Sequence, residues 1–423
     1  MQSIYGGAIQ TAPLLKFIPS NMENQFYISL KIYFLAIILC SVSTQSEAGI
    51  FPKKISIDIK VEGNITLAID IYKASNPRAL IVVSPGSEGF GENIIAALNQ
   101  KTESKLSKDK LIEVANEAGY SIAYYWQRGY LRTSDCLVGD SYEQRRKSFV
   151  DYCYKPNVRG KADLHTTTMD TEKVYKKLLI HPATKNLPIV SLAISEGSYH
   201  VSRLIESKKI QPIGIVFIGG LFGSLRETVE YQLRNDFYME KIYQTFKLTG
   251  KEYISFADVV KYGKLNIFIE PPGKPPWGAA LAMGQIQINK DDAAARKSYF
   301  ENQFQKILAK HSILAIDTPT NGNFDGIEWP SSSSFNYLPQ QLLAKTKIVD
   351  YLDQYDKKIV YLYGSFDSLI KLPNSASCPY AKLKCRIETI QGVGHVLQDE
   401  SGFKPDRSLA AIINAVNEVA ANN

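Results

Sequence analysis

The sequence predicts an α/β protein with a mostly parallel central sheet. Short apolar runs alternate with longer segments of helical periodicity along most of the 423 residues. The runs 79–83 and 188–194 are almost continuously apolar, which is typical of strands covered on both faces. Strands that alternate with helices favour a parallel sheet between two helical layers, and a chain of this length can build one large core with an insertion.

The elements follow one another in this order. Residues 55–60 and 65–73 alternate apolar and polar side chains around Gly63-Asn64, which predicts a leading antiparallel hairpin. The other predicted core elements are a strand from Ala79, a helix from 111 that ends at Gly119, a strand at 121–126, a helix at 163–180, strands at 188–194, 212–218, 358–363 and 387–390, and a final helix at 408–421.

Ser195 stands at a sharp strand-to-helix junction. The apolar run to Ile194 leads directly into a segment of helical periodicity, and small residues, Ala193 and Gly197, lie two positions either side of the serine. A strained turn between a strand and a helix leaves no room for larger side chains there. This pattern is typical of a nucleophile elbow, although Ala193 replaces the first glycine of the usual motif.

An acid and a base follow two later predicted strands. Asp367 comes just after the run 358–363, and His395 comes just after the run 387–390. A serine hydroxyl needs an adjacent base, histidine is the base best matched to neutral pH, and a carboxylate orients it. We therefore predict Ser195, Asp367 and His395 as the catalytic residues, with Asp350 and Asp356 as alternatives for the acid.

The order Ser195, Asp367, His395 resembles that of the α/β-hydrolase superfamily, and the resemblance covers the chain from about residue 55 onward. It points to no specific member. It implies a backbone oxyanion hole with donors at Ser87, in the loop after the third strand, and at Glu196, the residue after the nucleophile. Among the remaining histidines, His200 either lines the site or has a structural role.

The resemblance also implies a cap. Residues 49–220 and 346–423 are expected to form the two parts of the hydrolase core, and 221–345 a mainly helical cap insertion. Helices are predicted at 224–247 and 291–311, and the proline-rich loop 271–277 is a candidate rim or hinge. Most apolar stripes of the insert should pack its own small core, and a few should face the pocket.

The N-terminus has the features of a signal peptide. Residues 32–42 form an apolar run too short to span a bilayer comfortably, preceded by Lys31 and followed by small residues up to Ala48. We predict a signal peptide over 1–48, with Met22 as a plausible true start and an uncleaved anchor as the alternative. The mature chain is expected to be secreted or periplasmic and to contain no stable membrane span.

Removal of the signal peptide leaves an even number of cysteines, which in an exported chain indicates disulfides. Three pairings are possible. The local one is favoured, because each of its pairs brackets a short loop: Cys136 with Cys153 and Cys378 with Cys385. The spacings do not fit a zinc site, and no cofactor or metal is predicted.

The charge pattern bears on the kind of partner. The formal net charge is +7, with lysines scattered rather than clustered, so a nucleic-acid partner is not expected. We predict a serine hydrolase that cleaves an ester of a small-molecule or lipid-like acyl substrate through an acyl-enzyme. The alternatives are a serine peptidase of the same fold, aminopeptidase-like, and a non-catalytic binding protein. The sequence gives no oligomeric state.

Overall fold

The structure is a computed structural model, and it describes thirteen stretches of the chain with gaps between them. These are residues 53–86, 110–159, 162–234, 236–263, 287–311, 323–324, 327–328, 337–367, 369–372, 378, 380, 383–399 and 404–421. The predicted signal peptide, the predicted donor Ser87 and the loop 271–277 lie outside the described residues.

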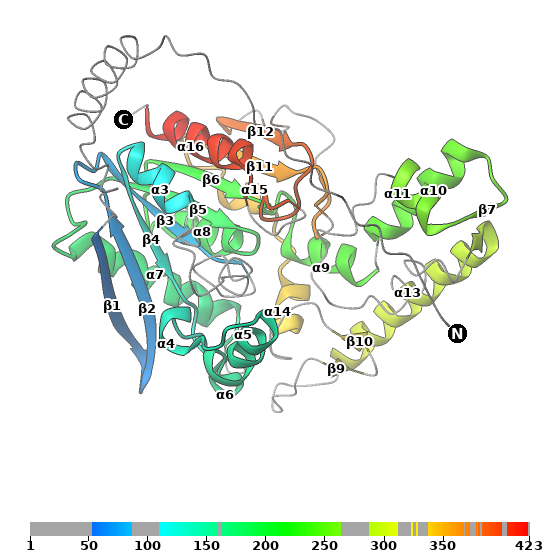
Figure 1. The fold of residues 1–423 in the computed structure, drawn as a ribbon, viewed down its shortest axis with the longest axis horizontal. Helices are drawn as coiled ribbons and strands as arrows, with labels where there is room; N and C mark the ends of the chain where they lie inside the picture. Colours follow the sequence, from blue (N-terminus) through cyan, green and yellow to red (C-terminus); the bar gives the residue numbers. More distant parts are fainter. Residues whose placement is uncertain are drawn as a thin grey trace, which may run out of the picture. The chain divides into compact units, whose positions relative to one another are not determined.

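An eight-stranded sheet forms the centre of the fold, in the order β1-β2-β4-β3-β5-β6-β11-β12 (Figure 1). The hairpin of β1 and β2 is antiparallel, β2 is antiparallel to β4, and the remaining neighbours are parallel. The strands are β1 (Lys53–Glu62), β2 (Ile65–Lys73), β3 (Ala79–Ser84), β4 (Tyr120–Tyr125), β5 (Ile189–Ile194), β6 (Gly214–Ile218), β11 (Ile359–Gly364) and β12 (Cys385–Ile390). The predicted hairpin and mostly parallel sheet are confirmed.

Helices cover both faces of the sheet. Successive side chains of a strand point to opposite faces, so each central strand contributes to both helical layers. Leu192 of β5 packs with Ile412 in the cluster under one helical layer, and the next residue, Ala193, packs with Val201 in the cluster under the other. The first layer contains α3 (Lys110–Glu117) and α16 (Asp406–Ala420), and the second contains α7 (Leu164–Ile180), α8 (Gly197–Glu206) and α15 (Ile348–Tyr351). Two-sided burial explains why the central strands are continuously apolar.

A disulfide-linked excursion separates β4 from α7. It contains α4 (Thr133–Cys136), α5 (Tyr142–Ser148), a π-helical turn η2 (Phe149–Cys153) and α6 (Pro156–Arg159). Cys136 is bonded to Cys153, with 5.2 Å between their Cα atoms, and Cys378 is bonded to Cys385, with 5.4 Å. The structure therefore has the two local disulfides that the cysteine spacing favoured. The sequence pattern predicted no separate element for this excursion.

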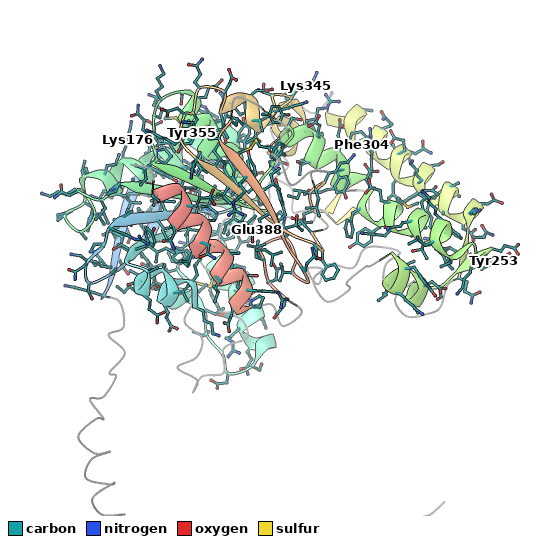
Figure 2. The ribbon with its side chains drawn as sticks, turned by 90° about the horizontal axis from the view of Figure 1, so that it is seen from above. Lys176, Tyr253, Phe304, Lys345, Tyr355 and Glu388 are labelled. Atoms are coloured by element: carbon teal, nitrogen blue, oxygen red, sulfur yellow. A yellow bond between two sulfur atoms is a disulfide. The ribbon has the colours of Figure 1, made fainter. Side chains whose placement is uncertain are left out.

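The insert after β6 forms a small core of its own. One apolar cluster joins Phe300 to four residues of α10, which are Phe237, Met239, Ile242 and Phe246. In Figure 2 the labels Phe304 and Tyr253 mark the position of the insert. The described elements are α9 (Leu225–Leu233), α10 (Asp236–Thr249), β7 (Tyr253–Ile254), α11 (Phe256–Tyr262), β8 (Ile288–Asn289), α13 (Lys290–His311), β9 (Asn323–Phe324), β10 (Ile327–Glu328) and α14 (Tyr337–Leu343). Most of the apolar stripes thus stabilise the insert itself.

The prediction of one helix over 224–247 is wrong, because this stretch holds two helices, α9 and α10. The first of them starts at a capping box that sequence periodicity does not detect. The Ser224 hydroxyl accepts a hydrogen bond from the Glu227 backbone N–H, and the Glu227 carboxylate accepts one from the Ser224 backbone N–H. Within the described residues, none of the helices is both long and apolar enough to cross a bilayer.

We expect removal of the first disulfide to destabilise the protein more than removal of the second. The crosslinks span 17 and 7 residues, and a longer loop loses more entropy when it is closed. The Cys136→Ser/Cys153→Ser variant should lose about 2–4 kcal/mol of unfolding free energy in urea titrations. Peptide mass spectrometry without reduction should recover both linked pairs, and four free thiols in protein from its native compartment would refute the pairing.

Candidate active site

Ser195 occupies a strained turn between β5 and α8. Its φ is +52°, in the left-handed region that costs a non-glycine residue about 1–2 kcal/mol. The Ser195 backbone N–H donates to the carbonyl of Ile218, at the end of β6, over 2.9 Å. The strain is therefore maintained by the neighbouring strand, and strain of this kind is characteristic of functional sites.

The small residues around Ser195 have a steric cause. Gly197 lies against the end of β3, and a Cβ there would contact the Ser84 carbonyl and come within 2.8 Å of the Pro85 carbonyl. Ala193 is completely buried between β3 and β6. An added side chain at either position would push the outgoing helix away from the sheet.

Gly86, which follows β3, lies beside Ser195. A Cβ on Gly86 would lie 2.9 Å from the Cβ of Ser195, and the Gln127 side-chain amide donates to the Gly86 carbonyl over 3.2 Å. The segment that leads into the predicted donor Ser87 therefore runs beside Ser195. Glu196, the other predicted donor, begins the turn into α8.

His395 and Asp367 form a buried pair. His395 Nδ1 lies 2.8 Å from Asp367 Oδ2, and the two residues are 8% and 1% exposed. The other carboxylate oxygen, Oδ1, accepts backbone N–H groups from Leu369 and Ile370. This arrangement holds the carboxylate in place and leaves Nε2 as the nitrogen that can face a hydroxyl.

The alternative acids do not share this position. Asp350 and Asp356 are both exposed. Asp356 comes before β11 and pairs with Lys357, whereas Asp367 follows the same strand. Asp350 lies in α15, and Asp356 lies before the amino end of β11. Among the described carboxylates, that of Asp367 contacts His395.

Gly219 links the surroundings of Ser195 to those of His395. It follows Ile218, the residue that accepts the Ser195 N–H, and a Cβ at Gly219 would lie 2.7 Å from His395 Nδ1. Its φ of +53° and its N–H bond to the Leu362 carbonyl fix it between β5 and β11. Ser195, Asp367 and His395 thus all lie at the carboxyl edge of the sheet.

Sequence reasoning missed a hydroxyl brace under the site. The Tyr175 hydroxyl of α7 lies 2.7 Å from the Ser191 hydroxyl of β5 and 3.3 Å from the Ser84 hydroxyl of β3. Burial raises the pKa of Tyr175 to about 12, so the hydroxyl keeps its proton through the ordinary pH range. No local pattern marks this contact, because its partners are far apart in sequence.

His200 has the structural role that the sequence left as an alternative. It is 1% exposed on α8, and its Nδ1 lies 2.8 Å from the hydroxyl of Thr168 on α7. Its Nε2 lies 3.3 Å from Glu196 Oε1. Among the described residues, no group of His, Cys, Asp and Glu side chains is arranged to hold a metal ion.

Comparisons with known proteins give structural likeness only. No family model matches the chain, and no curated protein matches it. A proline iminopeptidase from Mycobacterium smegmatis is 12% identical, with 87% of this chain and 99% of that chain covered and a TM-score of 0.45. A carboxyl esterase from Bacillus coagulans is 14% identical, with 87% and 99% covered and a TM-score of 0.46. A monoglyceride lipase from Saccharomyces cerevisiae is 13% identical, with 89% and 97% covered and a TM-score of 0.45.

The fold assignment rests on the geometry of this chain. A mostly parallel sheet is covered on both faces, a serine stands in a strained turn between a central strand and a helix, and an acid and a histidine follow two later strands. The chain has the α/β-hydrolase fold. Strands of the central sheet lie on both sides of the mainly helical stretch between β6 and β11.

We expect Gly219→Ala to disrupt the site far beyond its backbone cost. Gly63 provides a matched control, since its φ of +51° is nearly that of Gly219 and a Cβ there meets nothing within 4 Å. Gly63→Ala should cost only about 1–2 kcal/mol of stability. Gly219→Ala must also displace His395, and a shift of about 1 Å should lower ester hydrolysis about 100-fold. Thermal unfolding and hydrolysis rates of both variants test this, and equal effects would contradict it.

Proposed function

We propose that this protein is a serine hydrolase that cleaves ester bonds through an acyl-enzyme intermediate. One observation carries the proposal. Ser195 stands in a strained elbow and donates its backbone N–H to Ile218. The next residue, Gly219, lies against His395, which is paired with Asp367. A strained serine beside an oriented histidine is the arrangement that acyl transfer needs.

In the first half of the reaction, the Ser195 hydroxyl oxygen attacks the acyl carbon. His395 Nε2 accepts the hydroxyl proton, and Asp367 stabilises the resulting imidazolium through Nδ1. The carbonyl oxygen becomes an oxyanion, which the backbone N–H groups of Glu196 and Ser87 are proposed to stabilise, each by about 3 kcal/mol. His395 then returns the proton to the departing alcohol, and the C–O bond of the ester breaks.

In the second half, water replaces the alcohol. His395 removes a proton from the water as its oxygen attacks the acyl carbon of the Ser195 ester. Collapse of this intermediate releases the carboxylic acid and returns the proton to the Ser195 oxygen. The cycle as proposed uses Ser195, His395, Asp367, two backbone N–H donors and water, so the proposal includes no cofactor.

The substrate is proposed to be a small-molecule or lipid-like acyl ester, with residues 221–345 as a cap. Two attachments support the cap. Leu225 of α9 packs in the core cluster beneath the sheet, and Gln341 of α14 donates to Glu196 beside the nucleophile. Both ends of the insert therefore join the core, and the end at α14 does so beside the elbow. We also propose that the protein is exported, which agrees with its two disulfides.

Ser195→Ala should abolish labelling by a fluorophosphonate and lower ester hydrolysis by several orders of magnitude, because the nucleophile is lost. Asp367→Asn should lower kcat about 10⁴-fold with the fold intact. Gel fluorescence after labelling and hydrolysis of p-nitrophenyl esters provide the measurements. Labelling that persists in Ser195→Ala would rule out the nucleophile, and a stronger effect at Asp350 or Asp356 would rule out the acid.

The same panel separates the three function classes. Amino-acyl anilides, offered beside the p-nitrophenyl esters, should be poor substrates if the protein is an esterase. Faster hydrolysis of the anilides would identify a peptidase. An absence of both activities, together with no fluorophosphonate labelling, would identify a non-catalytic binding protein.

The cap proposal predicts a selective loss of chain-length preference. Replacement of residues 236–336 by a Gly/Ser linker keeps α9 and α14, which contact the core, and removes the rest of the insert. Each buried methylene of an acyl chain is worth about 0.8 kcal/mol, so preference for longer chains should fall while reactivity toward an acetate stays similar. An unchanged preference in a folded deletion variant would show that core loops build the pocket.

A further inference from the structure

The residue after the nucleophile carries a buried carboxylate for which the proposed reaction has no use. Glu196 lies between Ser195 and Gly197 and is only 3% exposed. Removing a carboxylate from water costs several kcal/mol unless hydrogen bonds and charges compensate it. A neutral apolar side chain would avoid this cost, so the partners of Glu196 indicate what the carboxylate does.

Two of those partners come from two different helices. The Gln341 side-chain amide of α14 donates to Glu196 Oε2 over 2.5 Å, and His200 Nε2 of α8 lies 3.3 Å from Oε1. His200 Nδ1 continues the network to the hydroxyl of Thr168 on α7. Glu196 therefore connects the last helix of the insert with the nucleophile helix and a core helix.

The network acts on the peptide that joins Ser195 to Glu196. The carbonyl of this peptide accepts hydrogen bonds from the backbone N–H of Ser198 over 3.0 Å and from its hydroxyl over 2.6 Å. The N–H of the same peptide belongs to Glu196 and is the proposed oxyanion donor. Ser198 thus fixes one end of the peptide plane, and the bonds of the Glu196 side chain fix the other.

We propose that Glu196 is a positioning residue for the oxyanion hole, held in place by Gln341 of the insert. The inference rests on the proposed serine hydrolase function. Glu196 contacts neither substrate nor reacting atoms through its side chain; it sets the direction of its own backbone N–H. Docking of α14 consequently completes the active site as well as attaching the insert.

The chain offers a matched control in the preceding residue. Gln340 also connects α14 to the core, because its side-chain oxygen accepts the backbone N–H of Leu164 over 3.0 Å. It does not contact the elbow through that bond. Loss of Gln340 should weaken the attachment of α14 to a similar extent and leave the peptide between Ser195 and Glu196 in place.

The first experiment compares Gln341→Leu with Gln340→Leu. Gln341→Leu should lower kcat for a p-nitrophenyl ester, and the rate constant for fluorophosphonate labelling, about 10- to 100-fold, with KM little changed. Gln340→Leu should keep both rates within about threefold of wild type. Hydrogen exchange at residues 195–200, followed by mass spectrometry, should speed up in Gln341→Leu alone, and this readout does not need activity.

The second experiment exchanges the carboxylate of Glu196 and the amide of Gln341. Gln341→Glu places two carboxylates within hydrogen-bond distance and should lower kcat at least as much as Gln341→Leu. Glu196→Gln, which keeps an acceptor for Gln341, is the second single variant of the double-mutant cycle. The double variant Glu196→Gln/Gln341→Glu restores one donor and one acceptor, so it should recover most of the activity lost in Gln341→Glu.

The outcomes separate the two proposals. The positioning role would be overturned by equal losses of kcat in Gln340→Leu and Gln341→Leu, or by a double variant no more active than Gln341→Glu. The hydrolase proposal would still stand if labelling of the wild type depends on Ser195. Wild-type protein that is not labelled, or labelling that survives Ser195→Ala, would overturn the hydrolase proposal and the positioning role of Glu196 with it.

Discussion

The close approach of backbone segments at the carboxyl edge of the sheet is the constraint on which the rest of the site depends. Gly197 lies against the end of β3, Gly219 against the ring of His395, and Gly364 against the backbone of Val393 and Gly394. Each contact leaves no space for a Cβ. The strained Ser195 is held between these segments, and its cost of about 1–2 kcal/mol is small beside the burial on both faces of the sheet.

Local sequence signals were sufficient for the sheet and for the order of the candidate site residues. Continuous apolar runs mark strands buried on two sides, and residues directly after parallel strands meet at one edge whatever the length of the crossovers. Ser195, Asp367 and His395 could be selected for that reason. The small residues Ala193 and Gly197 were also readable, since a crowded turn restricts size at fixed positions.

Contacts between distant segments could not be predicted in the same way. Tyr175, Gln127 and Gln341 act on the site through partners 16 to 145 residues away in the chain, and each is an ordinary residue for its helix or loop. The division of 224–247 into two helices was missed because no glycine or proline in this stretch marks the end of a helix. Ser87 lies outside the described residues, so its role stays a prediction.

The insert is joined to the core at points that matter for chemistry as well as for stability. Gln232 of α9 donates to the carbonyl of Leu369, whose own N–H donates to Asp367, and Gln341 of α14 donates to Glu196. One end of the insert is thus connected through Leu369 to Asp367, and the other to Glu196, the residue after Ser195. A displacement of either helix would therefore change the surroundings of a proposed site residue without altering that residue. In this arrangement the insert and the site cannot vary independently, because hydrogen bonds from α9 and α14 help to set the site's geometry.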